Sequence, residues 1–254
     1  MTRDQFARGV LLASVLGGVS YVASWGMTLP VPLELAWKGS GVALLAVFAV
    51  LNARDRHGWL LAAVMAFGAL GDVLLHFGAV PGGAAFLAGH LTAIGLYLGN
   101  RRRDITRSQL ALAVCIVPAT VLIAFLLSAD RATAPGIALY ATGLSLMAAT
   151  AWTSRFPRFR VGIGALMFVV SDLLIFARSG PQESLLNGLA VWGLYYFGQL
   201  LICVGVVSAL AKTSPLPREG EGDHQNTITP SSGASANNRA TSAGRRSRAR
   251  AWLM

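Results

Sequence analysis

Charged side chains are scarce in this sequence, where they make up 13% of the 254 residues. Soluble domains carry about 25% charged residues. Hydrophobic residues account for 54% of the chain, and the mean hydropathy is +0.58. This composition argues against a soluble domain and favours a membrane protein.

Cysteine is also rare. The chain has 2 cysteines, Cys115 and Cys203, and both lie within apolar runs. Two cysteines in such positions form neither a metal-binding motif nor a disulfide framework. We therefore expect both thiols to pack among apolar neighbours, and we predict no metal and no cofactor.

Long polar stretches are missing between the apolar runs, so no soluble domain fits between them. Each run is close to the ~20 residues that cross a bilayer. The first run follows Arg3 and Arg8 but is too long for a signal peptide, which indicates an uncleaved helix. We predict an all-α, polytopic membrane protein with eight transmembrane helices, at residues 9–29, 33–51, 59–78, 83–99, 109–128, 135–153, 161–179 and 185–211.

The charges that are present are mostly basic, with 21 Lys and Arg against 11 Asp and Glu and a formal net charge of +10. Most arginines lie in the breaks between apolar runs, which indicates contact with anionic lipid head groups rather than with nucleic acid. They concentrate in alternate breaks, at residues 54–56, 101–107 and 155–160. The positive-inside rule then places both termini in the cytoplasm. We expect a multi-pass protein of the cell membrane, which is the inner membrane in a Gram-negative host.

The composition changes to Ser, Gly, Asn, Pro and Arg after the last apolar run. Such a segment has too few apolar residues to offset the entropy lost on ordering. We predict two regions, an eight-helix transmembrane domain at residues 1–212 and a disordered basic cytoplasmic tail at residues 213–254.

Two carboxylates, Asp72 and Asp172, lie inside long apolar runs, in the third and the seventh predicted helix. A charged side chain at the bilayer centre costs at least ~2.5–3.5 kcal/mol, so two in matching settings indicate a function. Residues 67–72 align with residues 167–172 without a gap. The alignment predicts a parallel 4+4 internal repeat, whose pseudo-twofold axis brings both carboxylates to one depth, past the midplane toward the outer leaflet.

Further polar and aromatic side chains lie near the carboxylates in the predicted helices. His76 follows Asp72 by one helical turn, and glycines at 68, 71, 89 and 198 let helices approach closely. Trp192, Tyr195, Tyr196, Gln199 and Cys203 form a stripe at spacings of three and four along the eighth predicted helix, which is also typical of simple packing. A lysine near a helix end often extends to the head groups. The remaining candidates are Lys38, His90, Tyr97, Tyr140, Trp192, Tyr195, Tyr196, Gln199 and Cys203.

Six motifs occur in order over about residues 10–211. They are Lys38, Phe67-Gly68-Ala69-Leu70-Gly71-Asp72-Val73-Leu74-Leu75, Phe86-x-x-Gly89-His90 with Tyr97, Pro135 with Tyr140, Gly164-Ala165-x-x-Phe168-x-x-Ser171-Asp172, and Tyr195-Tyr196-x-x-Gln199-x-Leu201-Ile202. With these motifs the sequence resembles the YhhN-like lysoplasmalogenases, a family of eight-helix membrane enzymes. It departs from the family pattern at Gly39, where a proline is expected after the lysine.

The resemblance implies hydrolysis of the vinyl-ether bond of a lysoplasmalogen, or of a related ether lipid, to a fatty aldehyde and a glycerophospho-base. That reaction needs one protonated carboxyl and one carboxylate, which two carboxyls in a low-dielectric site supply. We therefore expect Asp72 and Asp172 to be the catalytic pair, with acid and base unassigned. The expected partners are a lysophospholipid substrate and membrane lipids, with no nucleic acid and an unknown oligomeric state. The candidates for substrate binding are Lys38, His90, Tyr97, Tyr140, Tyr195, Tyr196 and Gln199.

Other functions are compatible with two buried carboxylates. A proton-coupled transporter or lipid carrier relays protons through such groups, although the paired mid-helix Gly/Pro breaks common in transporters are missing and Pro118 stands almost alone. An intramembrane aspartyl protease carries Gly-x-Gly-Asp, which the Gly68-x-x-Gly71-Asp72 sequence does not match. A purely structural membrane protein would tolerate leucine at both aspartate positions.

Overall fold

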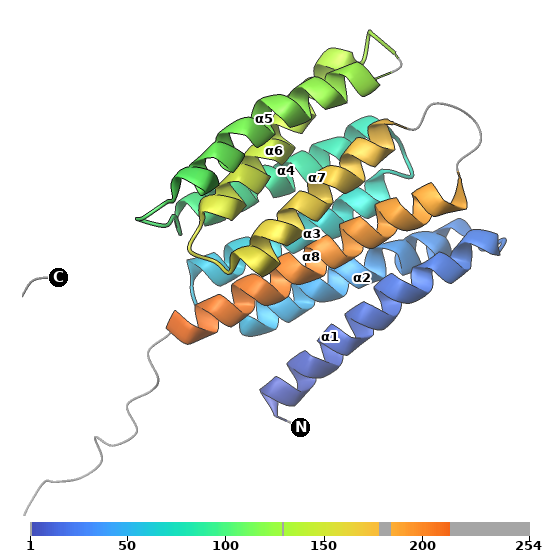
Figure 1. Cartoon of the computed structure of the whole chain (residues 1–254). Helices are drawn as coiled ribbons and strands as arrows, with labels where there is room; N and C mark the ends of the chain where they lie inside the picture. The colour runs from blue at the N-terminus through green and yellow to red at the C-terminus, as the bar shows by residue number, and fades with distance from the viewer. Residues whose placement is uncertain (1, 129, 178–183, 214–254) are drawn as a thin grey trace, which may run out of the picture. The chain divides into compact units, whose positions relative to one another are not determined.

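The computed structural model describes residues 2–128, 130–177 and 184–213. Within these residues the chain is helical with no β-strand, and eight helices are long and apolar enough to cross a membrane. The prediction of an all-α fold with eight spans is confirmed. The predicted tail at residues 213–254 lies outside the described residues apart from Thr213. The elements are α1 Arg3–Ser20, the 3₁₀ segment η1 Tyr21–Gly26, α2 Val31–Asn52, α3 Arg56–Leu74, α4 Ala79–Leu98, α5 Arg107–Leu127, α6 Ala134–Thr153, the π-helical segment η2 Arg158–Gly162, α7 Ile163–Phe176 and α8 Leu185–Thr213 (Figure 1).

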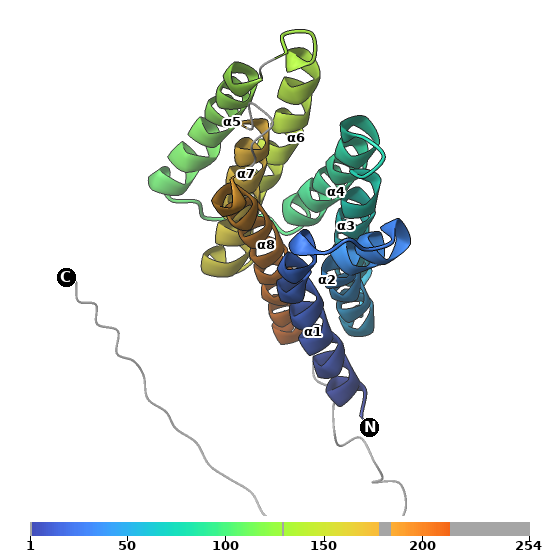
Figure 2. The ribbon, with the colours of Figure 1, turned by 90° about the vertical axis from the view of Figure 1, so that its right-hand side faces the viewer.

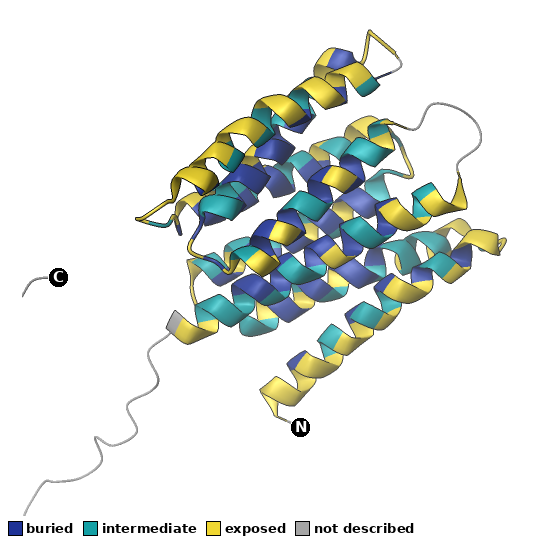
Figure 3. Cartoon of the chain, in the orientation of Figure 1, coloured by how far each residue is buried: buried dark blue, intermediate teal, exposed yellow. Residues whose placement is uncertain are grey.

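The outer surface of the helices is apolar, as a bilayer environment requires. Leu12 and Leu16 of α1 and Val114 and Leu122 of α5 are all exposed. Figure 3 shows exposed residues along the outer faces of α1 and α5 and buried residues on the helices between them. Exposed leucines and valines cost free energy in water and none in lipid. Cys203 is buried as expected, whereas Cys115 lies on the exposed face of α5.

Helices that follow one another in the sequence pack closely in five pairs, which are α1 with α2, α2 with α3, α3 with α4, α5 with α6 and α7 with α8. The two halves of the chain meet where α8 contacts α2 and α3, and where α4 contacts α6. Figure 2 shows α8 between α1 and α7, with α3 and α4 on the same side of α8 as α1. Residues of α3 and of α8 therefore face each other in the interior.

Helices α1 and α2 approach each other closely, and the ring of Tyr196 from α8 packs against both at this point. A Cβ added to Gly41 would lie 2.9 Å from the Cα of Gly18, so only glycine fits there. The Ser14 hydroxyl donates to the Gly41 carbonyl at 2.6 Å and contacts the Tyr196 hydroxyl at 3.0 Å. Trp192 adds a hydrogen bond of 2.7 Å from its indole N–H to the Gly18 carbonyl. These contacts join α8 to α1 and α2.

The ends of several helices differ from the prediction. Helix α1 begins at Arg3 rather than residue 9, because the Thr2 hydroxyl and the Gln5 side chain form a capping box. Helix α3 ends at Leu74 rather than residue 78. There the backbone N–H of His76 bonds the Val73 carbonyl three residues back. His76 is exposed and lies in this turn, after the last residue of α3.

After α1 the chain forms the 3₁₀ segment η1, whereas a continuous helix over residues 9–29 was predicted. The Ser24 hydroxyl donates to the Tyr21 carbonyl at 2.7 Å, and the Trp37 indole of α2 donates to the Ser20 hydroxyl at 3.0 Å. Hydroxyl groups that bond backbone carbonyls in this way favour a tighter turn. Tyr21 and Trp25 thereby come together with their rings edge to face, 6.2 Å apart.

Two of the arginine-rich breaks lie at the same end of the bundle and bond to each other. The Arg155 N–H donates to the Asn100 carbonyl at 2.8 Å, and the Arg102 N–H donates to the Thr153 carbonyl at 3.1 Å. A common location is what the positive-inside argument requires of these breaks. The orientation of the termini stays a prediction.

The predicted 4+4 repeat also stays a prediction, and one detail of the helix starts agrees with it. Helices α1 and α5 would be equivalent, and both begin with a capping box, formed by Thr2 with Gln5 and by Thr106 with Gln109. The shared Thr-Arg-x-Gln sequence is a further match between the halves.

Candidate active site

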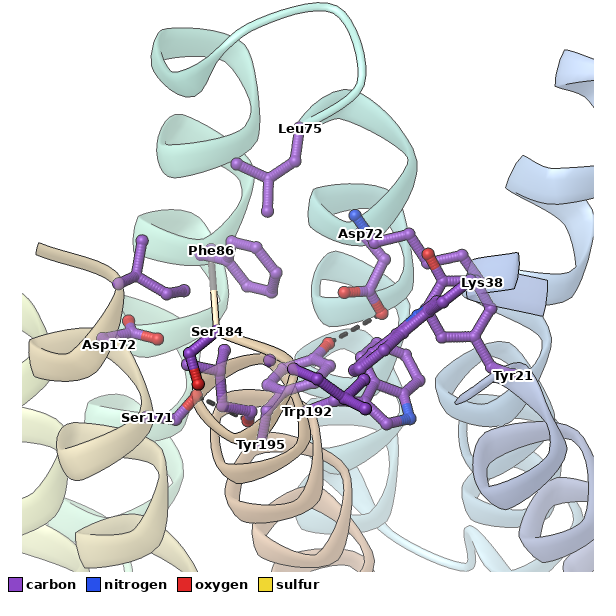
Figure 4. A pocket seen from close by; sticks show the side chains of 15 residues that line it. Tyr21, Lys38, Asp72, Leu75, Phe86, Ser171, Asp172, Ser184, Trp192 and Tyr195 are labelled. Atoms are coloured by element: carbon purple, nitrogen blue, oxygen red, sulfur yellow. Dashed lines mark hydrogen bonds between the residues drawn. The ribbon is translucent and has the colours of Figure 1, made fainter. Parts of the chain in front are cut away.

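A cavity of about 510 Å³ lies at the end of the bundle where α3 and α7 end and α8 begins. Its walls come from η1, α2, α3, α4, α7 and α8. Asp72, two residues before the end of α3, and Asp172, four residues before the end of α7, both line it. Figure 4 shows Asp72 and Asp172 on opposite sides of this cavity, with Phe86 between them.

Asp72 is held by the hydroxyl group of a tyrosine from the other half of the chain. Its side chain is buried, with 2% exposed, and its Oδ2 accepts a hydrogen bond of 2.8 Å from Tyr195 of α8. The same hydroxyl lies 3.4 Å from the Gly68 carbonyl and makes a polar contact with the Gln199 amide. The half-buried Lys38 of α2 is close enough for its charge to act on Asp72.

Asp172 is held in the same manner by a different tyrosine. Its Oδ2 accepts a hydrogen bond of 2.6 Å from the hydroxyl of Tyr140 in α6, and Asp172 is also buried, with 6% exposed. His90 Nε2 of α4 lies 3.2 Å from the same hydroxyl. Because the single proton of Tyr140 points to the carboxylate, the phenol oxygen accepts and His90 donates from Nε2, an assignment made from the hydrogen-bond network.

Aromatic rings pack between the carboxylate-bearing helices, and two of them, Phe86 and Tyr195, line the cavity. Phe86, Phe168 and Tyr195 contact one another edge to face, with ring centroids 5.2 to 6.0 Å apart. Phe86 fits because Gly71 has no side chain: a Cβ there would lie 2.8 Å from the Phe86 ring. The Ser171 hydroxyl donates to the Val191 carbonyl at 2.9 Å and ties α7 to α8. The carboxylates are therefore carried on rigid, packed helix ends.

The structure brings most of the predicted site residues together. Lys38, Asp72, Asp172 and Tyr195 line the cavity. Tyr140, His90 and Gln199 stand behind them, through the contacts of Tyr140 with Asp172 and of Gln199 with Tyr195.

Two predicted substrate-binding residues lie elsewhere. Tyr196 is buried in the contact of α1, α2 and α8, where it bonds Ser14. Tyr97 lines a separate cavity of about 10 Å³ together with His90 and Gln199. Its hydroxyl has no hydrogen-bond partner within the part of the chain that the structure describes. Neither side chain lines the larger cavity.

Two cavity residues, Tyr21 and Trp25, were missed from the sequence. Both belong to η1, which the hydropathy pattern had merged into a continuous first helix. The ring centroids of Tyr21 and Trp192 lie 4.6 Å apart with the rings tilted by 53°, and Trp192 was among the candidates named from the sequence. The available signal was the pairing of Tyr21 and Trp25 with the hydroxyl residues Ser20 and Ser24, which favour a tight turn.

The described residues contain no group of three or more His, Cys, Asp or Glu side chains arranged to hold a metal ion. The cavity presents two carboxyls, the ammonium group of Lys38 and the phenol of Tyr195, and the Tyr140 phenol bonds Asp172 from behind. Such a set is suited to proton transfer at a bond placed between the carboxyls.

The sequence profile of the YhhN family matches residues 33–206. Lysoplasmalogenases of Mycobacterium bovis and Mycobacterium tuberculosis are each 32% identical to the chain over 188 residues, which cover 68% of this chain and 70% of each relative. No solved structure matches the chain. The profile includes α2 through most of α8, and with them both carboxylates and their tyrosine partners. This chain belongs to the YhhN family.

Proposed function

We propose that this protein hydrolyses the vinyl-ether bond of lysoplasmalogens, giving a fatty aldehyde and a glycerophospho-base. The observation that carries the proposal is a pair of buried carboxyl groups on one cavity, each bonded by a tyrosine. Relatives named lysoplasmalogenase, at moderate identity, support the same reaction. They do not favour a proton-coupled transporter.

The chemistry of an enol ether explains why two carboxyls are needed. A carboxylic acid first protonates the β-carbon of the vinyl ether, which leaves an oxocarbenium ion at the α-carbon. A carboxylate stabilises this cation and removes a proton from the water that attacks it, giving a hemiacetal. Proton transfers of this kind by positioned side chains contribute typically 10²–10⁴-fold to the rate.

The same pair completes the reaction without an outside proton. The carboxyl that received the proton of water returns it to the glycerol oxygen, and that C–O bond breaks. The carboxylate that protonated carbon takes the hydroxyl proton of the hemiacetal as the aldehyde forms. Both groups then regain their starting protonation states, and the net reaction adds one water.

The cavity has the size and the polarity of a lipid site. Ligand pockets commonly measure about 300–1,000 Å³, with few polar groups among apolar walls. Lys38 supplies one positive charge for the phosphate of the lipid. Residues such as Leu75, Ile175 and Val191 supply apolar contact for its hydrocarbon chain. With both termini in the cytoplasm of a cell-membrane protein, as the arginine pattern predicts, this end of the bundle lies in the outer leaflet.

The test uses the purified full-length protein in detergent with three lysolipids of one chain length, joined by an alkenyl, an alkyl or an acyl bond. We expect fatty aldehyde from the alkenyl lipid and no product from the alkyl lipid, since a saturated ether has no carbon that accepts the proton. Cleavage of the acyl lipid at an equal rate, or absence of aldehyde, would contradict the proposal.

Lys38→Met is expected to weaken binding of the phosphate. A hydrogen bond or ion pair to a charged group contributes about 1.5–3 kcal/mol, so the KM for lysoplasmalogen should rise about tenfold or more. The KM for an alkenylglycerol, which lacks the phosphate, should stay unchanged. Lys212→Met, at the opposite end of α8, is the matched control. An equal KM change for both substrates would refute a phosphate contact.

Two adjacent tyrosines are expected to respond differently to the loss of one hydroxyl. Tyr195→Phe removes the hydrogen-bond donor to Asp72. Because a hydrogen bond to a charged group contributes about 1.5–3 kcal/mol, kcat should fall about tenfold or more. Tyr196→Phe removes the contact with Ser14 and should lower the free energy of unfolding by about 1 kcal/mol with kcat unchanged. Aldehyde release and thermal denaturation measure the two effects. Equal kcat values for the two variants would show that the bond from Tyr195 to Asp72 does not contribute to the reaction.

A further inference from the structure

The cavity has two chemically different sides, and the two carboxyls belong to different sides. Lys38 acts on Asp72, and Figure 4 shows Lys38 and Tyr21 beside Asp72 while Asp172 stands across Phe86. Asp172 is followed one turn later by Phe176, whose ring contacts that of Tyr140 at 6.0 Å. Among the described residues that line the cavity Lys38 is the one cation, and it lies beside Asp72, whereas Asp172 bonds the phenol of Tyr140.

The predicted repeat accounts for this difference. Lys38 in α2 and Tyr140 in α6 would occupy equivalent positions, each facing the aspartate of the next helix in its own half. One half thus carries an ammonium group where the other carries a phenol. Two halves that differ at this position provide two carboxyls in unlike electrostatic surroundings.

The order of atoms along a lysoplasmalogen matches the two sides in one direction. The lipid runs from the hydrocarbon chain through the β-carbon, the α-carbon and the ether oxygen to glycerol and phosphate. A phosphate bound by Lys38 lies on the side of Asp72, and the hydrocarbon chain then extends past Asp172. The β-carbon faces Asp172, while the α-carbon and the ether oxygen face Asp72.

We infer that Asp172 is the general acid that protonates the β-carbon and that Asp72 is the general base that activates water at the α-carbon. This assignment rests on the proposed function. The proton leaves the Asp172 carboxyl for carbon as the π-bond breaks, and the resulting cation is held by the Asp72 carboxylate. Water then forms the new C–O bond while its proton passes to Asp72.

The hydrogen bonds of the two carboxyls fit these roles. Tyr140 occupies Oδ2 of Asp172, which leaves Oδ1 to carry the acidic proton. His90 donates to the Tyr140 oxygen and so directs the phenol proton at that carboxyl, which makes His90 a positioning residue. Lys38 lines the cavity beside Asp72 and so places a positive charge next to the carboxyl that acts as the base.

The assignment is tested by chemical rescue of Asp72→Ala and Asp172→Ala with sodium azide. Azide is an anion that captures an oxocarbenium ion without the help of a base, and Lys38 remains to attract it in Asp72→Ala. We expect azide to raise substrate consumption by Asp72→Ala about tenfold, which restores part of the roughly 10²–10⁴-fold that a general base contributes. The product should be a 1-azidoalkyl ether of the lysolipid, identified by mass. Asp172→Ala, unable to form the cation, should not respond.

Each other outcome overturns the assignment. Rescue of Asp172→Ala alone would reverse the assigned roles of acid and base. Rescue of both variants by azide, or of neither, would show that the two carboxyls do not have separate roles. Asp72→Asn and Asp172→Asn, which preserve side-chain volume, replace any alanine variant that does not fold. Wild-type protein that releases no aldehyde from the same substrate would instead refute the proposed function, so the two failures are distinguishable.

Discussion

Asp72→Asn and Asp172→Asn are each expected to lower aldehyde release by about 10²–10⁴-fold, the usual contribution of a general acid or base. Both side chains line the cavity, and both are more than nine-tenths buried. An amide at either position neither donates the proton to carbon nor accepts one from water. The measurement is kcat for aldehyde release by purified variants.

Both asparagine variants should nevertheless fold and insert. Asparagine has the volume of aspartate, and its carbonyl oxygen still accepts the hydrogen bond from Tyr195 or from Tyr140. A neutral amide also costs less to bury than a carboxylate. Wild-type elution from size exclusion in detergent, with an unchanged melting temperature, is the control. Normal turnover by either variant would remove that aspartate from the reaction.

Gly164→Ala and Gly198→Ala are expected to lower stability strongly, because each added methyl group meets backbone. A Cβ at Gly164 would lie 2.6 Å from the Gly198 carbonyl oxygen, and a Cβ at Gly198 would lie 2.8 Å from the Gly164 carbonyl oxygen. Helices α7 and α8 must then move apart, and overpacking of this kind costs about 1–3 kcal/mol. For a domain of this size each kcal/mol lowers the melting temperature by about 2–4 °C.

Gly193→Ala is the matched control for these glycines, since it lies in α8 and its Cβ would meet nothing within 4 Å. Alanine also has a higher helix propensity than glycine, so this variant should melt at or above the wild-type temperature. Thermal denaturation in one detergent compares the three variants. Equal melting temperatures for Gly198→Ala and Gly193→Ala would show that α7 and α8 do not pack through these residues.

The helices and the identity of the carboxylates were predictable from the sequence for physical reasons. A bilayer demands runs of about 20 apolar residues, so hydropathy alone located all eight spans. It also makes buried charge costly, which set Asp72 and Asp172 apart from other polar residues. The distance between two helices is not encoded in hydropathy, so the shared cavity needed the structure.

Details that depend on local backbone geometry were not predictable in the same way. His76 lies beyond the end of α3, because the chain leaves the helix through a turn that precedes Gly78, whose φ is +144°. Tyr195 and Tyr196 are adjacent and have equal hydropathy, yet a rotation of about 100° per helical residue sends one to the cavity and the other toward α1. Choosing between them requires the position of neighbouring helices.

The pairing of the site side chains was the feature least accessible from the sequence. Tyr195 of α8 bonds Asp72 of α3, and Tyr140 of α6 bonds Asp172 of α7, while His90 of α4 supports the second pair. The sequence marked all five side chains as candidates. It gave no means of pairing them, because the contact of α8 with α3 joins residues 123 positions apart.

The central claim is that this cavity protonates the β-carbon of a vinyl ether and then adds water. Hydrolysis of an alkenyl lysophospholipid by the purified protein in D₂O, with mass analysis of the fatty aldehyde, tests it most directly. Protonation by a carboxyl that exchanges with solvent places one deuterium on carbon 2 of the aldehyde. We expect this singly labelled aldehyde. Aldehyde without deuterium, or no aldehyde at all, would contradict the claim.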